Sequence, residues 1–470
     1  MTRLRRAIGP VQLLLYGVGS MLGAGIYGLV GKAAGVMGGA VWMAFLVAMV
    51  AALLTGVSYA SIASRYPKAG GAAYATQRAY RSSWLSYLVG LAIVCSGLGS
   101  IATQSKVVAE NLNTLIGLDF GFTIAGASAE VMVLAIGFLL LVAGIVYRGI
   151  TESLWANAIC TLVESLGLLL VIVVGVRFWG QADLFEVPVS AANPAGALTV
   201  GLLLQGSILT FFSFLGFEDM LNVAEEVKQP ERTIPLALIG AMVLASVIYM
   251  AVSITAVSVV PWRELAEAPG PLKLVIERAA PWFPAVGFTL ITIAAVANTA
   301  LVNYVMGSRL LYGMARQGLL PSVLGRVHGA RQTPHVAIAV LLVIVIGLQF
   351  AGGIEQLASA TVLLLLLVFA VVNGALIVLT HRDGKIEGCF NAPIAIPAAG
   401  VLICLVMIVG RVQQDDWRGP AIAAGLIAMI LALYVLTRKS RRAGGVRRKT
   451  RHALATDRPP PSRNRPDRPV

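Results

Sequence analysis

The sequence predicts an all-α polytopic membrane protein with twelve transmembrane helices. Of its 470 residues, 58% are hydrophobic and 12% are charged, whereas a soluble domain has about 25% charged residues. The mean hydropathy of +0.83 points to the same class. Twelve segments are apolar over roughly the 20 residues that a membrane-spanning helix needs. They lie near residues 11–34, 40–63, 84–109, 130–147, 155–178, 199–222, 236–260, 284–312, 336–353, 357–380, 394–411 and 420–437.

Charges outside these spans predict the orientation. Loops on the side of the two termini are rich in Arg and Lys, as at Arg65, Lys68 and Arg316, whereas the opposite loops are short or acidic apart from 261–283. Positively charged loops stay in the cytoplasm. Because an even number of spans places both ends on one side, we expect a multi-pass protein of the plasma (inner) membrane with both termini cytoplasmic.

A basic tail, residues 438–470, ends the chain with twelve Lys or Arg against two Asp. It carries most of the net charge of +14, and much of the remaining basic charge lies in loops. We therefore expect no nucleic-acid partner and interpret the tail as disordered and cytoplasmic. One membrane domain, over 11–437, lies between the tail and a cytoplasmic N-terminus at 1–10, with the lipid bilayer around it.

The first span contains a glycine-rich string from Gly17 to Gly28. Each Gly costs a helix about 1 kcal/mol relative to Ala, and unwound backbone inside a membrane is tolerated only where it is buried in protein or lines a polar cavity. The same letters resemble a dinucleotide-binding fingerprint, but that motif needs an acidic residue about 20 positions later. The chain has no Asp or Glu before Glu110. We therefore interpret the string as a broken membrane helix.

A second break is predicted in the sixth span, where Gly216 is followed by Glu218 and Asp219. Paired interruptions at corresponding positions indicate a transporter built from inverted repeats around a midplane site, the arrangement known from the LeuT group. The sequence thus predicts a five-plus-five fold. Repeat one covers about 11–178, repeat two about 199–380, and spans 11 and 12 about 394–437.

Four motifs resemble the amino acid–polyamine–organocation (APC) superfamily, and they occur in family order between about residues 9 and 335. They are Gly19-Ser-Met-Leu-Gly23-Ala-Gly25-Ile-Tyr27, Tyr66-Pro67-x-x-Gly70-Gly71-x-x-Tyr74, the sixth span with its exit from Phe211 through Glu225-Glu226-x-Lys228-x-Pro230-x-Arg232-x-Ile-Pro235, and Arg309-x-x-Tyr312-x-Met314-Ala-Arg316-x-Gly318-x-x-Pro321. The resemblance implies a LeuT-type fold and a secondary active amino acid transporter that works by alternating access.

A zwitterionic substrate suits two broken helices. Free N–H groups at Ala24, Gly25 and Ile26 can bind a carboxylate at the positive end of a half-helix. Unwound carbonyls at Phe212, Ser213 and Leu215 can accept an α-ammonium group. The resemblance also places an aromatic gate at Phe212. The predicted substrate-binding set is Ser20, Gly23, Ala24, Gly25, Ile26, Phe212, Ser213, Leu215, Glu218 and Asn298.

Three of the predicted side chains have alternative interpretations. Glu164 lies in the middle of span 5, where many proton-coupled relatives have Lys; as an intramembrane carboxylate it is a candidate proton carrier, but a Na⁺ ligand or a purely structural group fits equally. Glu218 is either a substrate contact or a capping carboxylate. Asn298 is either a substrate ligand or a polar link between helices.

The sequence is also compatible with other functions. Glu164 and Glu218 leave a cationic amino acid or polyamine antiporter open, and a membrane substrate sensor is a further possibility. An enzyme is disfavoured because the four His residues fall in loops, span ends or the tail. We expect no cofactor and no metal site, H⁺ or Na⁺ as the coupling ion, and a monomer or homodimer.

Overall fold

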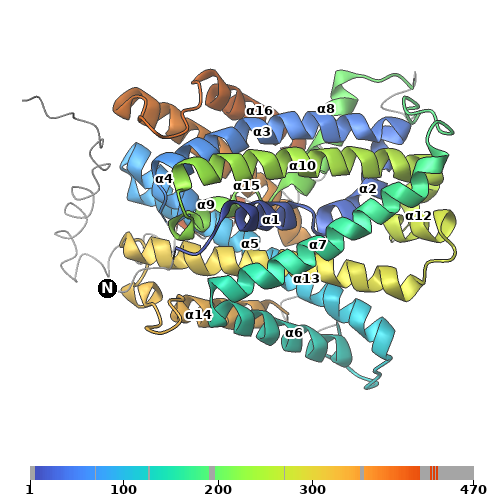
Figure 1. Ribbon diagram of the computed structural model, residues 1–470, viewed down its shortest axis with the longest axis horizontal. Helices are drawn as coiled ribbons and strands as arrows, with labels where there is room; N and C mark the ends of the chain where they lie inside the picture. The colour runs from blue at the N-terminus through green and yellow to red at the C-terminus, as the bar shows by residue number, and fades with distance from the viewer. Residues whose placement is uncertain are drawn as a thin grey trace, which may run out of the picture.

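A computed structural model describes residues 6–68, 70–124, 127–189, 196–268, 270–349 and 354–412, together with 424–425, 427–428 and 430–431. Within them the protein is a bundle of long helices that run side by side, as Figure 1 shows. Nine helical segments of the described residues are long and apolar enough to cross a membrane, and two more apolar helices are shorter. The predicted all-α polytopic class is therefore confirmed, whereas the count of twelve stays a prediction.

Each predicted span up to the eleventh has a counterpart. The helices are α1 (Pro10–Met21), α2 (Ala24–Met37), α3 (Val41–Arg65), α5 (Ser83–Ile116), α6 (Ala129–Arg148), α7 (Ile150–Gly175), α8 (Val200–Phe211), α9 (Asp219–Asn222), α10 (Pro230–Val259), α13 (Ala285–Arg316), α14 (His335–Gln349), α15 (Ile354–Asp383) and α16 (Ala395–Val412). The twelfth predicted span, 420–437, and the basic tail lie almost wholly outside the described residues.

Both predicted helix breaks are present. Helix α1 ends at Met21 and α2 begins at Ala24, so the first span is interrupted at residues 22–23. In the sixth span α8 passes into the 3₁₀ turn η3 (Phe212–Phe214), and a non-helical turn precedes α9 and a second 3₁₀ turn, η4 (Ala224–Glu226). The half of this span after the break is thus two short pieces rather than one continuous half-helix.

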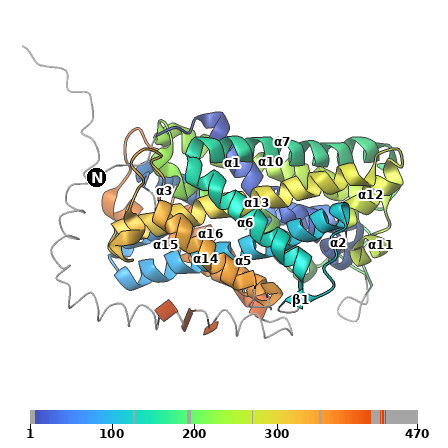
Figure 2. The ribbon, with the colours of Figure 1, turned by 90° about the horizontal axis from the view of Figure 1, so that it is seen from below.

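Packing brings these two interrupted spans to the middle of the bundle. Helix α10 runs along α3 and α1, and α8 packs against α3 and α2. Helix α13 runs along α5 and also contacts α7 and α1 (Figures 1 and 2). Buried hydrophobic side chains from most of these helices form one continuous core, which leaves α1 in contact with α10 on one side and with α7 and α13 on the other.

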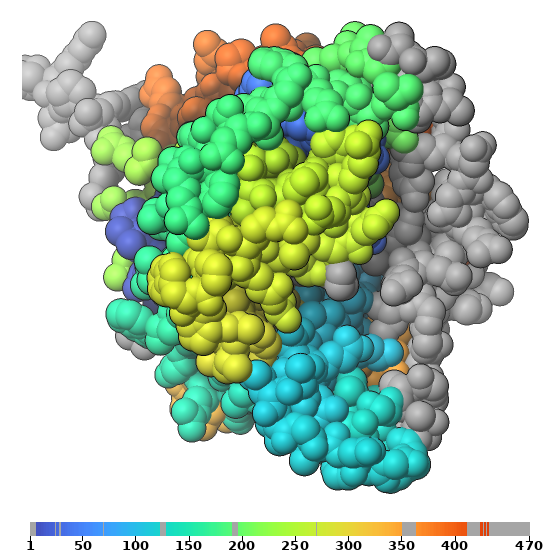
Figure 3. All heavy atoms as spheres, turned by 90° about the vertical axis from the view of Figure 1, so that its right-hand side faces the viewer, coloured from blue at the N-terminus to red at the C-terminus, as the bar shows by residue number. Residues whose placement is uncertain are grey.

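Short elements fill loops for which the sequence predicted no structure. They are α4 (Gly71–Tyr80), α11 (Trp262–Glu267), α12 (Pro271–Ala279), a small antiparallel pair β1 (Thr123–Ile124) and β2 (Ala127–Ser128), and the 3₁₀ turns η1 (Gly38–Ala40), η2 (Val176–Phe178) and η5 (Ser322–Gly325). Figure 3 looks onto the end of the bundle where the loop after α7, the α11–α12 segment and the end of α5 gather. The loops after predicted spans 3, 5 and 7 therefore share one end, as alternating spans require.

Candidate functional site

The two helix breaks touch each other. Ser20, in the last turn of α1, donates its hydroxyl to the Gly216 carbonyl at 2.9 Å and lies 3.0 Å from Asp219 Oδ2. Gly216 has φ +120°, a conformation that favours glycine, and a Cβ there would lie 2.5 Å from the Ser20 carbonyl oxygen. The chain turns at Gly216 because only a residue without a side chain fits against α1.

Glycines on the other side of the break allow a second close approach. A Cβ on Gly25 would lie 2.9 Å from the Ser213 Cα, and one on Gly23 would lie 1.7 Å from Thr299 Oγ1. Since the first four N–H groups of a helix have no intrahelical acceptor, the N–H groups of Ala24, Gly25 and Ile26 lie in the unbonded first turn of α2. This is the local geometry that a carboxylate site needs, and the binding role of these residues stays a prediction.

The predicted carbonyls of span 6 differ in how they are engaged. The Phe212 carbonyl accepts from the Leu215 N–H at 3.2 Å, whereas the Ser213 carbonyl accepts from the Tyr249 hydroxyl at 2.8 Å. The Phe212 side chain is half-buried, between the fully buried Phe211 and Phe214. Of these three Phe residues, Phe212 alone is partly exposed, and its role as a gate stays a prediction.

Four polar side chains form a buried cluster between α1, α7 and α13, here called the polar cluster: Asn157, Thr161, Glu164 and Asn298. Asn298 Nδ2 lies 2.9 Å from Thr161 Oγ1 and 3.0 Å from Glu164 Oε1. Asn157 Nδ2 donates to Asn298 Oδ1 at 2.8 Å. Among the described residues, Glu164 Oε2 has no hydrogen-bond partner although the side chain is fully buried.

Helix α1 reaches this polar cluster through its backbone. The Gly19 carbonyl accepts from Asn298 Nδ2 at 3.4 Å, and the Leu15 carbonyl accepts from the Thr161 hydroxyl at 3.4 Å. Both ends of the Asn298 amide are thus occupied by α1 and α7. This geometry favours the interpretation of Asn298 as a link between helices, and its contact with substrate stays a prediction.

Glu218 lies within the break itself. Its Oε2 accepts from the Gly216 N–H at 2.8 Å, and the side chain is 6% exposed. The carboxylate therefore caps an N–H group of the unwound segment rather than the start of a long half-helix, because α9 has only four residues. A direct contact between Glu218 and substrate stays a prediction.

A buried ion pair lies beyond the sixth span. Arg309 Nε is 2.7 Å from Glu226 Oε2, and the two side chains are 0% and 1% exposed. The Glu226 carbonyl accepts from the N–H groups of Ala7 and Ile8, so the segment before α1 is attached to the same point. Burial raises the pKa of the Glu226 carboxyl, and the adjacent Arg309 guanidinium, which lowers that pKa, offsets only part of the effect.

Tyr249 is a further residue at the breaks, and the sequence does not predict it. It lies on α10, is fully buried, and its hydroxyl contacts the carbonyls of Met21 and Ser213, one at each break. Nothing in the sequence singles it out, because a Tyr within an apolar span is usually a core residue and its partners lie 228 and 36 positions away.

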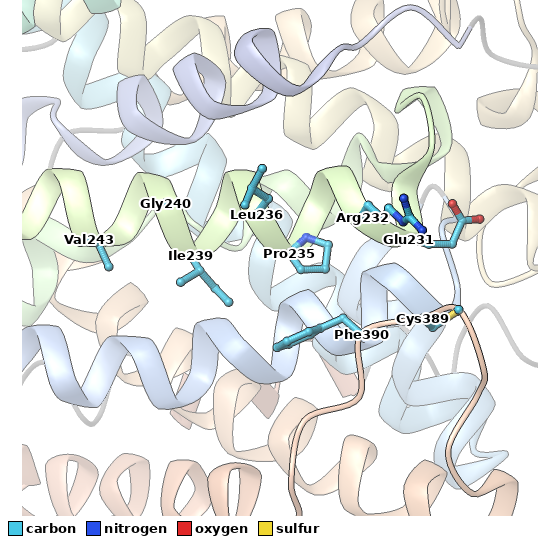
Figure 4. Close-up of a pocket in the computed structure, with 10 residues that line it drawn as sticks. Glu231, Arg232, Pro235, Leu236, Ile239, Gly240, Val243, Cys389 and Phe390 are labelled. Carbon is cyan, nitrogen blue, oxygen red and sulfur yellow. The ribbon is translucent and has the colours of Figure 1, made fainter.

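An apolar groove of about 680 Å³ lies apart from the two breaks. Figure 4 shows it between α10 and the loop before α16, with Pro235 and Ile239 on one wall and Phe390 on the other. Its charged lining residues, Glu231 and Arg232, are exposed at one end. The groove lies outside both helix breaks and is lined mainly by apolar side chains, so it does not suit a zwitterion.

The architecture defines the class of protein. Two interrupted membrane helices that meet inside a helical bundle are typical of secondary transporters whose substrate binds at the breaks. The family described as amino acid permease matches residues 8–435, and the chain belongs to this family.

Relatives within the family differ in their named substrates. The chain is 29% identical to the branched-chain amino acid permease BcaP of Bacillus subtilis, over 86% of this chain and 88% of that protein. It is also 29% identical to the methylthioribose transporter of Bacillus subtilis, over 86% and 87%. It is 30% identical to the vacuolar cationic amino acid transporter 4 of Arabidopsis thaliana, over 81% of this chain and 64% of that longer protein.

Proposed function

We propose that the protein carries a neutral aliphatic amino acid across the plasma membrane by alternating access, with both termini cytoplasmic. The observation that carries the proposal is the contact between the two breaks. It supports the proposal because the first turn of α2 and the backbone of η3 lie close together: a Cβ on Gly25 would lie 2.9 Å from the Ser213 Cα. Donors for a carboxylate and acceptors for an ammonium group thus lie side by side.

A neutral side chain is favoured over a cationic one by the engagement of the acidic residues. Glu218 Oε2 accepts from the Gly216 N–H, and Glu164 Oε1 accepts from Asn298. One oxygen of each carboxylate is therefore already engaged within the protein in this arrangement, which disfavours an ion pair with a substrate cation. The similarity to a branched-chain amino acid permease supports the same choice, whereas the similarity to a cationic amino acid transporter keeps L-lysine as the alternative to test.

Proton coupling through Glu164 is the second part of the proposal. An unpaired buried carboxylate is costly in a membrane, and a neutral carboxyl is not. Glu164 Oε2 has no partner among the described residues, so it is the atom that can take up a proton. The Asn298 amide nitrogen already lies within hydrogen-bonding distance of the oxygens of Gly19, Thr161 and Glu164. These oxygens are therefore not available as a set of Na⁺ ligands in this arrangement, which favours H⁺ as the coupling ion.

Counterflow in proteoliposomes tests the transport function. Vesicles loaded with unlabelled L-leucine are expected to accumulate labelled L-leucine, and L-lysine to compete poorly. The variant Gly25→Leu is expected to abolish uptake, because its side chain collides with the η3 backbone. A matched control is Gly137→Leu, since Gly137 lies on α6 with open space where a side chain would go.

Three outcomes of this experiment contradict the proposal. Normal uptake by Gly25→Leu would remove the assigned carboxylate site, and preferential exchange of L-lysine would favour the cationic alternative. Binding without counterflow would favour a sensor over a transporter.

The variant Glu164→Gln tests the coupling. We expect it to keep L-leucine exchange but to lose stimulation by an imposed inward proton gradient, because Gln cannot take up a proton. Uptake driven by a pH difference across the liposome membrane measures this, with Glu152→Gln as the control because Glu152 is an exposed carboxylate on the same helix. An unchanged response of Glu164→Gln to the proton gradient would contradict the coupling role. Stimulation of the wild type by a Na⁺ gradient would identify Na⁺ as the coupling ion instead of H⁺.

A further inference from the structure

Tyr249 contacts both interrupted helices with a single atom. Its hydroxyl oxygen lies 2.8 Å from the Ser213 carbonyl oxygen and within hydrogen-bonding distance of the Met21 carbonyl oxygen. Met21 is the last residue of α1 and Ser213 is the middle residue of η3. In the described residues, no other side chain donates to a carbonyl of both breaks.

Two aromatic rings hold the Tyr249 ring in place. Phe45 of α3 lies 5.6 Å away between ring centroids, and Phe214 of η3 lies 5.2 Å away with its ring edge-on. All three side chains are fully buried. Because such packed rings have fixed rotamers, the position of the hydroxyl is set by α3, α10 and η3 together.

One proton is shared between two acceptors. A tyrosine hydroxyl has one O–H, and each carbonyl oxygen has two lone pairs. Both carbonyls lie where the helical hydrogen-bond ladder is interrupted, so they depend on partners from outside their own helix. While Tyr249 donates to one of them, the other keeps its full acceptor capacity and points toward the same hydroxyl.

We propose that Tyr249 is a positioning residue for the α-ammonium group of the substrate, an inference that rests on the proposed transport function. The hydroxyl fixes the spacing of the Met21 and Ser213 carbonyls, and its single proton leaves one of them free for a primary ammonium group. The ammonium group then donates to whichever of the two carbonyls does not receive the Tyr249 proton. Binding of the amino group thereby connects the two breaks through one rigid ring.

The variant Tyr249→Phe tests this inference, because it removes the hydroxyl and keeps the ring. Purified protein in liposomes is assayed for L-leucine uptake and for competition by 4-methylpentanoate, which is leucine without its amino group. We expect the KM for L-leucine to rise about ten-fold, as the loss of one well-placed hydrogen-bonding group predicts. The inhibition constant for 4-methylpentanoate should change less than about two-fold, because that ligand has no ammonium to place.

A matched control is Tyr304→Phe on α13. Tyr304 is also fully buried and its hydroxyl donates to the Ile338 carbonyl at 2.8 Å, at a site away from both breaks. This variant loses the same kind of hydrogen bond. It should leave the KM for L-leucine and the inhibition constant for 4-methylpentanoate unchanged. If Tyr249→Phe does not fold, Phe214→Leu replaces it as the test, because this variant frees one side of the Tyr249 ring. It should weaken the binding of L-leucine more than the binding of 4-methylpentanoate.

The possible results separate the two proposals. Failure of the wild type to exchange any amino acid would contradict the proposed function itself. If the wild type transports L-leucine, then an unchanged KM in Tyr249→Phe, or an equal loss of affinity for both ligands, would overturn the positioning role and leave Tyr249 as a structural residue.

Discussion

Gly19 shows how a single missing side chain determines what the first span can contact. A Cβ at this position would lie 2.0 Å from Thr161 Oγ1 and 2.5 Å from Asn298 Nδ2. The absence of a side chain lets the α1 backbone approach the polar cluster closely. The Gly19 carbonyl accepts a hydrogen bond from Asn298 Nδ2, and the Leu15 carbonyl accepts one from the Thr161 hydroxyl. The glycine therefore has a packing role here, separate from the helix break at residues 22–23.

A substitution at Gly19 should disturb the polar cluster without touching the breaks. We expect Gly19→Ala to reduce L-leucine uptake at least ten-fold and to lower the free energy of unfolding by about 1–3 kcal/mol, the usual cost of overpacking. Thermal unfolding in detergent and uptake in liposomes measure the two effects. Gly144→Ala on α6, where nothing lies within 4 Å of the new methyl group, is the control. If Gly19→Ala took up L-leucine at the wild-type rate, the prediction would be wrong, because the polar cluster could then shift to accommodate the methyl group without loss of transport.

Side-chain identity alone was enough to predict some functional residues and not others. The glycine string and the Gly216-x-Glu218 pair predicted the breaks, because glycine and charge are conspicuous inside apolar runs. Tyr249 could not be found this way. Its importance depends on a contact with Met21, which lies 228 residues away along the chain, and no local pattern encodes such a contact.

At the scale of elements, α10 shows why predicted boundaries differ from observed ones. The span was predicted from residue 236, but the helix begins at Pro230 and continues through Pro235. Pro235 has no N–H, so the Glu231 carbonyl loses its helical donor. The Ser64 hydroxyl of α3 donates to that carbonyl at 2.9 Å instead. A neighbouring helix thus stabilises a helical turn that propensity alone would exclude.

The other unpredicted elements have a different cause. Helices α4, α11 and α12 have 10, 6 and 9 residues and lie between spans. A search for apolar segments of about 20 residues passes over such short helices. Their buried faces pack against the ends of long helices, as α11 does against α2, so their formation depends on tertiary contacts rather than on their own sequence.

At the scale of the whole molecule, one ion pair connects the two sides of the bundle. The chain before α1 pairs with residues 226–228, through hydrogen bonds from the Ile8 N–H to the Glu226 carbonyl and from the Lys228 N–H to the Ile8 carbonyl. The Glu226 side chain then reaches Arg309 on α13. The two interrupted spans are therefore tied together at one end, and through Glu226 they are tied to the helix that packs along α5.

This connection should stabilise one arrangement of the bundle more than it stabilises the fold. Burial of two charges offsets most of their attraction, but removing one partner of such a pair typically costs about 3–5 kcal/mol, since the other charge stays buried. We expect Glu226→Gln and Arg309→Met each to lower the thermal unfolding midpoint in detergent strongly, and the double variant to recover most of the loss. The exposed ion pair Arg278–Glu264, whose charged atoms are 2.8 Å apart, is the control. The same set of two single variants and one double variant should show little coupling there.

Transport measurements distinguish a packing role of the Glu226–Arg309 pair from a role in conformational change. If Glu226 and Arg309 hold the bundle in one state of the alternating-access cycle, the stable double variant should bind L-leucine with near wild-type affinity but exchange it at an altered rate, because the barrier between states has changed while the breaks are intact. Thermal-shift titration measures the binding and counterflow measures the exchange. A double variant with wild-type exchange would restrict the pair to packing, and additive effects of the two single substitutions on the unfolding midpoint would contradict the coupling itself.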